Sequence, residues 1–228
     1  MKKISLLFLS LCSGAALFAQ TTQPQLRTPR TVTTHFGLRA GVNLSDLTAK
    51  NLPSSSKFTE AEMRTAYVLG AFANIPLSGM FRFQPELDFS SQGGKLQGPS
   101  GTTTAGTFDQ VLRYVNLPLN FQLMTKNGFF VQAGPQVSYL IDVNRKNSSN
   151  TTTNPNTSNK DDFDKLDLGF TGGVGYLSRM GLGIEARYNW GVANIVSDKA
   201  PSTSAYYGGT WKNQVAQISL VYHIGAAL

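Results

Sequence analysis

Two carboxylates and an arginine stand close together in the segment FRFQPELDFS, residues 81–90. Glu86 and Asp88 are two positions apart, and Arg82 precedes them. A pair of carboxyl groups can act as general acid and general base in a reaction. In a strand, however, residues two apart point to the same face, so both carboxylates would lie beside Arg82. Ion pairing therefore explains this group more simply than acid–base catalysis does.

A second acidic group lies in and just after the segment VNRKNSSNTTTNPNTSNKDDFDK, residues 143–165. Asp161, Asp162, Asp164 and Asp167 could offer oxygen ligands to a divalent cation. Their spacing has neither the glycine nor the distal glutamate of a calcium-binding loop. We therefore expect solvated side chains here, with no metal site and no cofactor. The rest of the segment is rich in Asn, Thr and Ser, which is typical of a flexible polar connection.

The element that carries the first group is a strand. Apolar side chains occupy the odd positions from Phe81 to Phe89, and polar ones occupy the even positions from Arg82 to Asp88. A period of two residues is the signature of a β-strand with one apolar and one polar face. The strand therefore places all three charged groups on one side.

The same alternation recurs along the chain. In the segment GLGIEARYNWGV, residues 181–192, Ile184 and Trp190 share one face while Glu185 and Arg187 share the other. We predict eight strands, at residues 34–44, 66–76, 80–90, 111–124, 128–141, 166–177, 181–192 and 214–225.

The connections between these strands alternate in length. Residues 77–79, 125–127 and 178–180 are short enough for hairpin turns, whereas the other four connections each run to about 20 residues. In the first long connection, TEAE at 59–62 fits a capping box and predicts a short surface helix. In an antiparallel arrangement every tight turn then lies at one end and every long loop at the other. Outer-membrane barrels are built in this way.

The two faces of the strands indicate which side meets lipid. The apolar face carries too many large side chains for the interior of an eight-stranded barrel, which is only just wide enough for side chains. The polar face is balanced in charge and interspersed with glycine, as a closed polar lumen requires. Within it we predict an ion-pair cluster. Its members are Arg39, Arg82, Glu86, Asp88, Glu185 and Arg187. The predicted fold class is all-β, an eight-stranded antiparallel up-and-down transmembrane β-barrel with short periplasmic turns and long extracellular loops.

The start of the chain predicts export. Lys2 and Lys3 precede an apolar run from Ile4 to Phe18, the pattern of a secretory signal peptide cleaved after Ala19. The only cysteine, Cys12, lies inside this run, so the mature chain would have no disulfide. We divide the chain into a signal peptide (1–19), an N-terminal periplasmic tail (20–33) and an outer-membrane β-barrel domain (34–228).

Composition narrows the partners. No later stretch approaches the roughly 20 continuous apolar residues of a membrane helix. Without its signal peptide the chain has 18 cationic and 13 acidic side chains, and they are scattered. We therefore expect contact with outer-membrane lipid and lipopolysaccharide, and no binding of nucleic acid.

Several motifs together resemble the PorT-like small outer-membrane β-barrel proteins. They are FGLRAGVNLSDL (36–47), FRFQPELDFSSQGGK (81–95), LRYVNLPLNFQL (112–123), VQAGPQVSYLI (131–141), DLGFTGGVGY (167–176) and GIEARYNWGVANI (183–195). The resemblance covers essentially the whole mature chain. It implies an eight-stranded barrel in the outer membrane of a Gram-negative cell, in a family most of whose members have no assigned activity. The last strand, QVAQISLVYHIGAAL, departs from the pattern because it continues past Tyr222 and Ile224.

The positions of the two histidines do not favour an enzymatic function. Barrel-type outer-membrane enzymes place a histidine among the catalytic groups near the outer surface, whereas His35 and His223 lie at the periplasmic ends of the first and last strands. We predict a non-enzymatic protein that acts through its extracellular loops in interaction, adhesion or envelope structure, with an unknown surface or envelope protein partner. A narrow pore or a transport or secretion accessory is the alternative, and an outer-membrane hydrolase is a distant third.

Overall fold

The computed structural model describes residues 33–51, 59–98, 106–147, 160–197 and 209–225. The predicted signal peptide and most of the predicted tail lie outside these residues. The described strands are β1 (His35–Lys50), β2 (Thr59–Glu62), β3 (Arg64–Ser78), β4 (Phe81–Gly98), β5 (Gly106–Met124), β6 (Phe129–Asn147), β7 (Leu166–Leu177), β8 (Leu182–Gly191) and β9 (Thr210–His223), with one 3-10 turn, η2 (Lys160–Asp162). Among the described residues no helix is long and apolar enough to cross a membrane.

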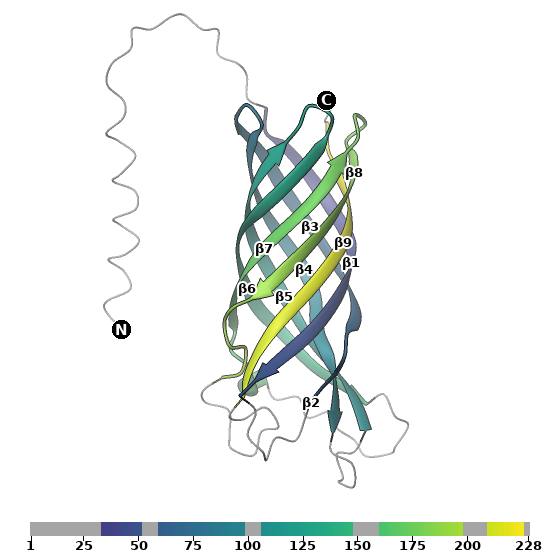
Figure 1. The fold of residues 1–228 in the computed structure, drawn as a ribbon, viewed down its shortest axis with the longest axis vertical. Coiled ribbons are helices and arrows are strands. Elements are labelled where there is room, and N and C mark those ends of the chain that lie inside the picture. The colour runs from purple at the N-terminus through teal and green to yellow at the C-terminus, as the bar shows by residue number, and fades with distance from the viewer. Residues whose placement is uncertain (1–32, 52–58, 99–105, 148–159, 198–208, 226–228) are drawn as a thin grey trace, which may run out of the picture. The chain divides into compact units, whose positions relative to one another are not determined.

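Eight of the strands close into an antiparallel barrel (Figure 1). Each of β1 and β3–β9 pairs with two neighbours within the ring, which the pairings of β1 with β9 and of β4 with β5 complete. Closure satisfies the backbone groups of every barrel strand, which a lipid environment demands because it offers them no water. The predicted eight-stranded fold is confirmed.

Three tight turns join strands at one end of the barrel. Gly79 and Met80 join β3 to β4, residues 125–128 join β5 to β6, and residues 178–181 join β7 to β8. Gly128 and Gly181 adopt φ values of +91° and +82°, in the left-handed region that glycine tolerates without steric cost. These turns lie within two residues of the predicted ones.

Every connection at the opposite end is shorter than predicted because the strands continue past the predicted limits. β1 extends to Lys50, β4 to Gly98 and β6 to Asn147. The segment TEAE forms β2 and pairs with β4, so the predicted surface helix is wrong. The extended part of β4 offers hydrogen-bond partners to the backbone of residues 59–62. Pairing with β4 therefore outweighs the local capping pattern, and the segment forms a strand.

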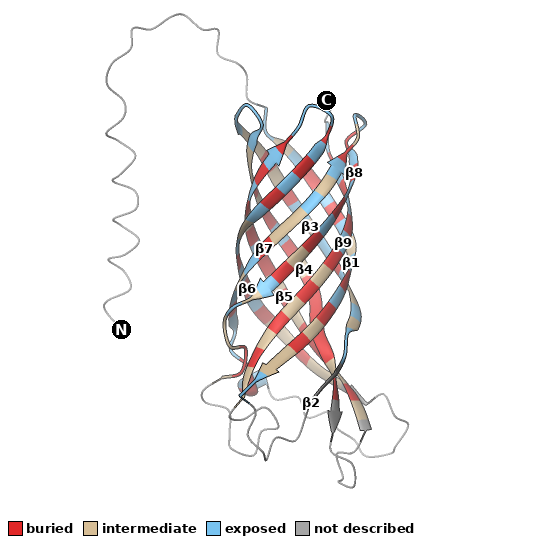
Figure 2. Ribbon diagram, viewed as in Figure 1, coloured by how far each residue is buried: buried red, intermediate tan, exposed pale blue. Residues whose placement is uncertain are grey.

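Burial alternates along most of the length of the barrel strands, as the banding in Figure 2 shows, whereas residues 90–94 near the loop end of β4 are all buried. The predicted lumen-facing residues are buried, except Arg82, which is half-buried. The predicted lipid-facing residues include many large exposed apolar side chains, such as Phe36, Leu38, Phe81 and Ile218. The inside-polar and outside-apolar assignment is therefore confirmed.

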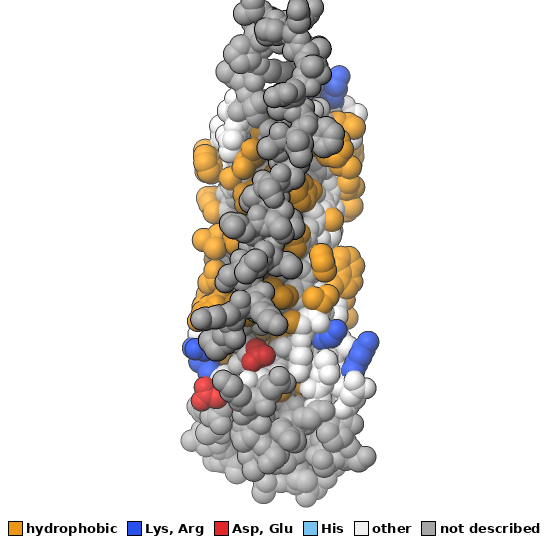
Figure 3. All heavy atoms as spheres, turned by 90° about the vertical axis from the view of Figure 1, so that its left-hand side faces the viewer, with side chains coloured by type: hydrophobic (Ala, Val, Ile, Leu, Met, Phe, Trp, Pro, Cys, Tyr) orange, Lys and Arg blue, Asp and Glu red, His pale blue; other side chains and the backbone are white. Residues whose placement is uncertain are grey.

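The polarity of the two faces reverses toward the loop end of the barrel. On β9 the outward residues change from Ile218 and Leu220 to Lys212 and Gln214, while the inward residues change from Gln217 to Trp211. Figure 3 shows the same limit on one side of the barrel, where charged side chains lie below the apolar band. An apolar band about 25 Å tall spans the lipid. Strands that continue beyond the band on the loop side must therefore bury apolar residues inward and expose polar ones to water.

Candidate functional site

The centre of the lumen holds a cluster of buried charges, here called the charge cluster. Its members are Arg39, Glu86, Asp88, Glu185 and Arg187. Arg39 lies on β1, the two acidic residues 86 and 88 on β4, and the remaining pair on β8. The register brings these strands' polar faces together across the barrel, which is why residues as far apart as 86 and 187 meet.

The two arginines bridge the carboxylates. Arg187 donates two hydrogen bonds to Glu86, at 2.8 and 2.9 Å, and one to Glu185 at 3.3 Å. Arg39 donates to Glu86 at 2.5 Å, to Asp88 at 3.3 Å and also to Glu185. Such bonds must compensate the large cost of removing charges from water, and they do so only when geometry and pairing are good.

Glycines make room for the cluster. Gly70 on β3 pairs with Asp88, and a Cβ at Gly70 would lie 1.9 Å from the Oδ1 atom of Asp88. At Gly41 on β1 a Cβ would lie 2.3 Å from the Oγ atom of Ser219, which accepts a hydrogen bond from Arg39 at 3.1 Å. The small residues on the polar faces thus leave the narrow lumen to the long charged side chains.

Arg82, which the sequence analysis placed in the cluster, lies apart from it. It donates to the Oδ1 atom of Asn74 at 2.9 Å. The Nδ2 atom of Asn74 in turn donates to Gln84 at 2.6 Å and to Gln122 at 2.9 Å. Arg82 lies close to the tight-turn end of β4, whereas Glu86 lies further along the strand toward the centre of the lumen. Spacing along a strand predicts which residues share a face. It does not predict at which level along the barrel axis a long side chain forms its hydrogen bonds.

The loop end of the lumen is filled by apolar side chains, here called the mouth cluster. Its members are Leu47, Leu96, Phe108, Leu112, Tyr114, Leu140, Val143, Phe163, Ile195, Val196 and Trp211. The sequence analysis missed this cluster because it treated these residues as loop or as ends of strands. A signal was available, since Leu47 and Trp211 have the same parity as the polar lumen residues of their own strands.

Two connecting segments fold into the mouth cluster. Phe163 bridges Val196, the Asp164 amide donates to the Ile195 carbonyl at 2.9 Å, and the Ile195 amide donates to the Trp211 carbonyl at 2.9 Å. These bonds join the segment before β7 to the segment after β8. Among the described residues, hydrogen-bonded backbone as well as packed side chains therefore occupy the mouth.

The four aspartates of the second acidic group do not form a joint site. Asp161 and Asp164 are exposed, Asp162 is buried beside the mouth cluster, and Asp167 is buried inside the barrel. The expectation that all four are solvated is wrong for Asp162 and Asp167, because η2 and the start of β7 turn them inward. No group of three or more His, Cys, Asp or Glu side chains suited to a metal ion occurs in the described part of the chain.

The histidines occupy the tight-turn end. His223 is buried, and its ring packs edge-on against Phe72 with the centroids 4.8 Å apart. His35 is half-buried at the start of β1, opposite Asn74. Neither lies beside the charge cluster, so the structure assembles no histidine–carboxylate pair there.

An exposed ion pair marks the loop end beyond the apolar band. Lys95 donates to Glu62 at 2.8 Å, and this hydrogen bond together with the lysine charge lowers the pKa of the Glu62 carboxyl. Both side chains are open to solvent, so the pair contributes little to folding.

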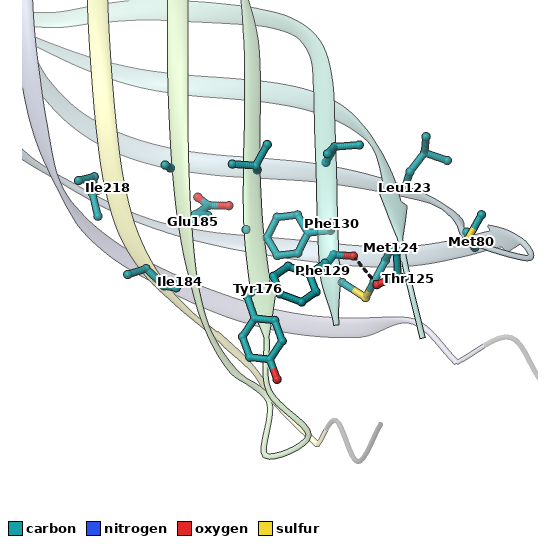
Figure 4. Close-up of a pocket in the computed structure, with 14 residues that line it drawn as sticks. Met80, Leu123, Met124, Thr125, Phe129, Phe130, Tyr176, Ile184, Glu185 and Ile218 are labelled. Carbon is teal, nitrogen blue, oxygen red and sulfur yellow. Dashed lines mark hydrogen bonds between the residues drawn. The ribbon is translucent and has the colours of Figure 1, made fainter. Parts of the chain in front are cut away.

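An apolar groove of about 580 Å³ lies on the outer wall near the tight-turn end (Figure 4). Phe129, Tyr176, Ile184 and Ile218 line it from four neighbouring strands. Glu185 is its one ionisable carboxylate, and the charge cluster already binds that group. The groove therefore belongs to the apolar outer wall of the barrel.

The closed ring, the outward apolar band and the polar interior define an outer-membrane β-barrel protein. A family model described as the outer membrane protein beta-barrel domain matches residues 18–197. The chain belongs to this family.

Solved structures of small outer-membrane proteins are similar to this chain. Neisserial surface protein A (NspA) matches at 10% identity with a TM-score of 0.45, over 82% of this chain and 96% of that one. OprG from Pseudomonas aeruginosa matches at 14% identity with a TM-score of 0.46, over 86% of this chain and 98% of that one. The Yersinia pestis attachment invasion locus protein Ail, solved with the heparin analogue sucrose octasulfate, matches at 7% identity with a TM-score of 0.38, over 83% and 99%. No curated protein sequence matches.

Proposed function

We propose that this protein acts at the cell surface through its extracellular loops, in interaction, adhesion or envelope structure, and that it is not an enzyme. The closure of its interior at two heights supports this proposal. The charge cluster fills the centre of the lumen, where its five members are at most 4% exposed, and the mouth cluster fills the loop end. With the described side chains packed at both of these heights, the proposal favours the outer surfaces as the place for function.

Two carboxylates of the charge cluster are held by several donors each. Glu86 accepts hydrogen bonds from Arg39, Arg187, Gln84 and Asn120, and Glu185 accepts from both arginines and Gln132. A carboxylate held by several donors is a poor proton acceptor, because those donors stabilise its charged form. This favours a structural role for the charge cluster.

Lipid and lipopolysaccharide are the partners that the outer wall favours. Exposed Lys50 on β1 is paired with Thr210, and outward-facing Lys212 on β9 is paired with Thr48, so the two lysines are diagonal neighbours just above the apolar band. Two adjacent ammonium groups at this height suit a lipid phosphate. Reduced lipopolysaccharide in preparations of the Lys50→Gln/Lys212→Gln double variant would support this partner, and an unchanged amount would count against it.

A narrow pore or a transport or secretion accessory is the second candidate. The amide network of Asn74, Gln84, Gln122 and Gln132 makes the tight-turn half of the lumen polar, as a water-filled path would be. The resemblance to PorT-like proteins favours a link to secretion. Export behind a signal peptide cleaved after Ala19 is part of both candidates.

Two variants separate the candidates. Replacing residues 148–159 by a short Gly-Ser link changes the connection between β6 and β7, whereas Arg187→Ala changes only the lumen. Whole cells would be treated with a membrane-impermeant amine crosslinker, and the proteins joined to each variant identified by mass spectrometry. We expect the loop replacement to lose the crosslinked partners and Arg187→Ala to keep them. The reverse pattern, in variants that both still insert into the outer membrane, would favour the transport candidate.

A further inference from the structure

A small cavity of about 10 Å³ lies inside the barrel, between the charge cluster and the mouth cluster. Asp167 on β7, Asn189 on β8 and Asn213 on β9 line it together with Gln136 and Ser138 of β6. Along β9 the order runs from Trp211 of the mouth cluster through Asn213 to Ser219, which binds Arg39. This volume corresponds to a single occupant the size of one water molecule.

Asp167 brings a carboxylate to this cavity. Its side chain is buried, with 4% of the residue exposed. The Oδ2 atom accepts a hydrogen bond from the Nδ2 atom of Asn213 at 2.9 Å, whereas none of the described residues donates to the Oδ1 atom. One of the two carboxylate oxygens is thus left for another partner.

The two asparagines present oxygens as well, because their amino groups are committed elsewhere. The Nδ2 atom of Asn213 donates to Tyr114 at 3.2 Å as well as to Asp167. The Nδ2 atom of Asn189 donates to Gln217 at 3.4 Å, and Gln217 donates to Ser219 at 3.1 Å, toward the charge cluster. The Oδ1 atoms of both asparagines receive no hydrogen bond within the described part of the chain.

Three residues that line this space, on three neighbouring strands, thus each carry an acceptor oxygen without a donor among the described residues. A water molecule has two protons to donate and would leave one oxygen unmatched. A cation can be attracted to all three, and carboxylate and amide oxygens of this kind suit hard cations better than soft ones. The charge cluster joins two arginines to three carboxylates, so it has no surplus positive charge to neutralise Asp167.

We propose that this cavity binds one small monovalent cation through Asp167, Asn189 and Asn213. A single carboxylate matches one positive charge, whereas a calcium site usually brings several carboxylates to the ion. The ion ties β7, β8 and β9 together beneath the mouth cluster. Because packed side chains lie above and below the cavity, the ion enters while the barrel folds.

The test compares barrels refolded in different salts. The purified mature protein would be refolded into detergent micelles in NaCl or in N-methyl-D-glucamine chloride at equal concentration, since the organic cation is too large for the cavity. The measured quantity is the urea concentration at which half of the protein is unfolded. We expect this midpoint to be higher in NaCl. The ratio of folded to unfolded protein should rise tenfold for each tenfold rise in Na⁺ above the dissociation constant of the site.

Two matched variants assign the response to the cavity. Asp167→Asn should remove the difference between the two salts. Asp142→Asn should keep it, because Asp142 pairs with Arg113 on the partly exposed wall of the same end of the barrel. If Asp167→Asn does not fold, crystals of the wild type grown with Tl⁺, a scatterer that replaces K⁺, would show an anomalous peak between Asp167 and Asn213.

Three results would overturn the proposal. Equal midpoints for the wild type in both salts would mean that the cavity holds water or a protonated Asp167. A sodium response that persists in Asp167→Asn would place the ion elsewhere. Tl⁺ crystals without a peak in the cavity would contradict it directly.

Discussion

Glu86 accepts hydrogen bonds from four side chains of the lumen. It accepts hydrogen bonds from Arg39 and Arg187 of two other strands, and from Gln84 and Asn120. Because it is 2% exposed, its loss would leave two arginines with fewer partners in a place that water does not reach. Breaking one partner out of a buried ion pair usually costs far more than the pair as a whole contributes to stability.

We expect Glu86→Gln to lower the free energy of unfolding by about 3–5 kcal/mol while leaving the strand content unchanged. Glutamine keeps the size of the side chain and removes its charge. Urea unfolding in lipid vesicles, followed by tryptophan fluorescence, measures the change. Glu62→Gln is the control, because it removes a carboxylate that also binds one cation but is exposed to solvent. Equal stability of the two variants would mean that the charge cluster contributes nothing to folding.

Each strand of the barrel follows two environments along its length. On β9, Ile218 is 60% exposed on the apolar band, and Gln214 lies four residues nearer the loops on the same face. The bulge in β6, where Ile141 is extra between the pairs Arg113–Asp142 and Tyr114–Leu140, lies near this transition. A single strand therefore has the outward apolar face of a membrane strand at one end and the outward polar face of a water-soluble protein at the other.

The limit of the band makes a prediction for β9. We expect Ile218→Arg to destabilise the barrel by about 2–4 kcal/mol, because it places a charge on the lipid face within the membrane. Gln214→Arg should cost much less, since that position lies above the lipid. Folding equilibria in vesicles of uniform acyl-chain length would report both values. If the two substitutions cost the same, the band does not end between these residues.

The whole barrel combines a closed hydrogen-bond ring with an interior filled at two heights. Ring closure leaves no barrel strand with an unpaired edge, and the clusters inside hold the strands from the lumen side. Both features join the strands to one another, through the backbone and through the lumen. They also leave little room for ions to pass.

We expect the purified protein to migrate faster on detergent gels before boiling than after, because the closed ring resists detergent until heated. In a planar bilayer the same sample should give no large steady currents. Identical mobility in both lanes would contradict the closed barrel. Steady single-channel currents would show that one of the two clusters opens, and would shift the proposed function toward a pore.

Much of this architecture could be predicted from the sequence. The period of two residues in each segment predicted both the strands and their faces, because side chains alternate across a strand whatever its surroundings. Connection lengths predicted which ends carry turns, since a hairpin needs only a few residues. The charged residues of the lumen were found in the same way, as charges that share a face in a chain whose other face is apolar.

The tertiary structure decided what lies at which height. It separated Arg82 from the charge cluster, turned TEAE into a strand and packed Leu47 and Trp211 into the mouth. Each of these outcomes depends on contacts between strands far apart in the chain, and on where the lipid ends along the barrel. Alternation by itself predicts inside and outside, whereas the partner of an inward side chain depends on the register and tilt of all eight strands.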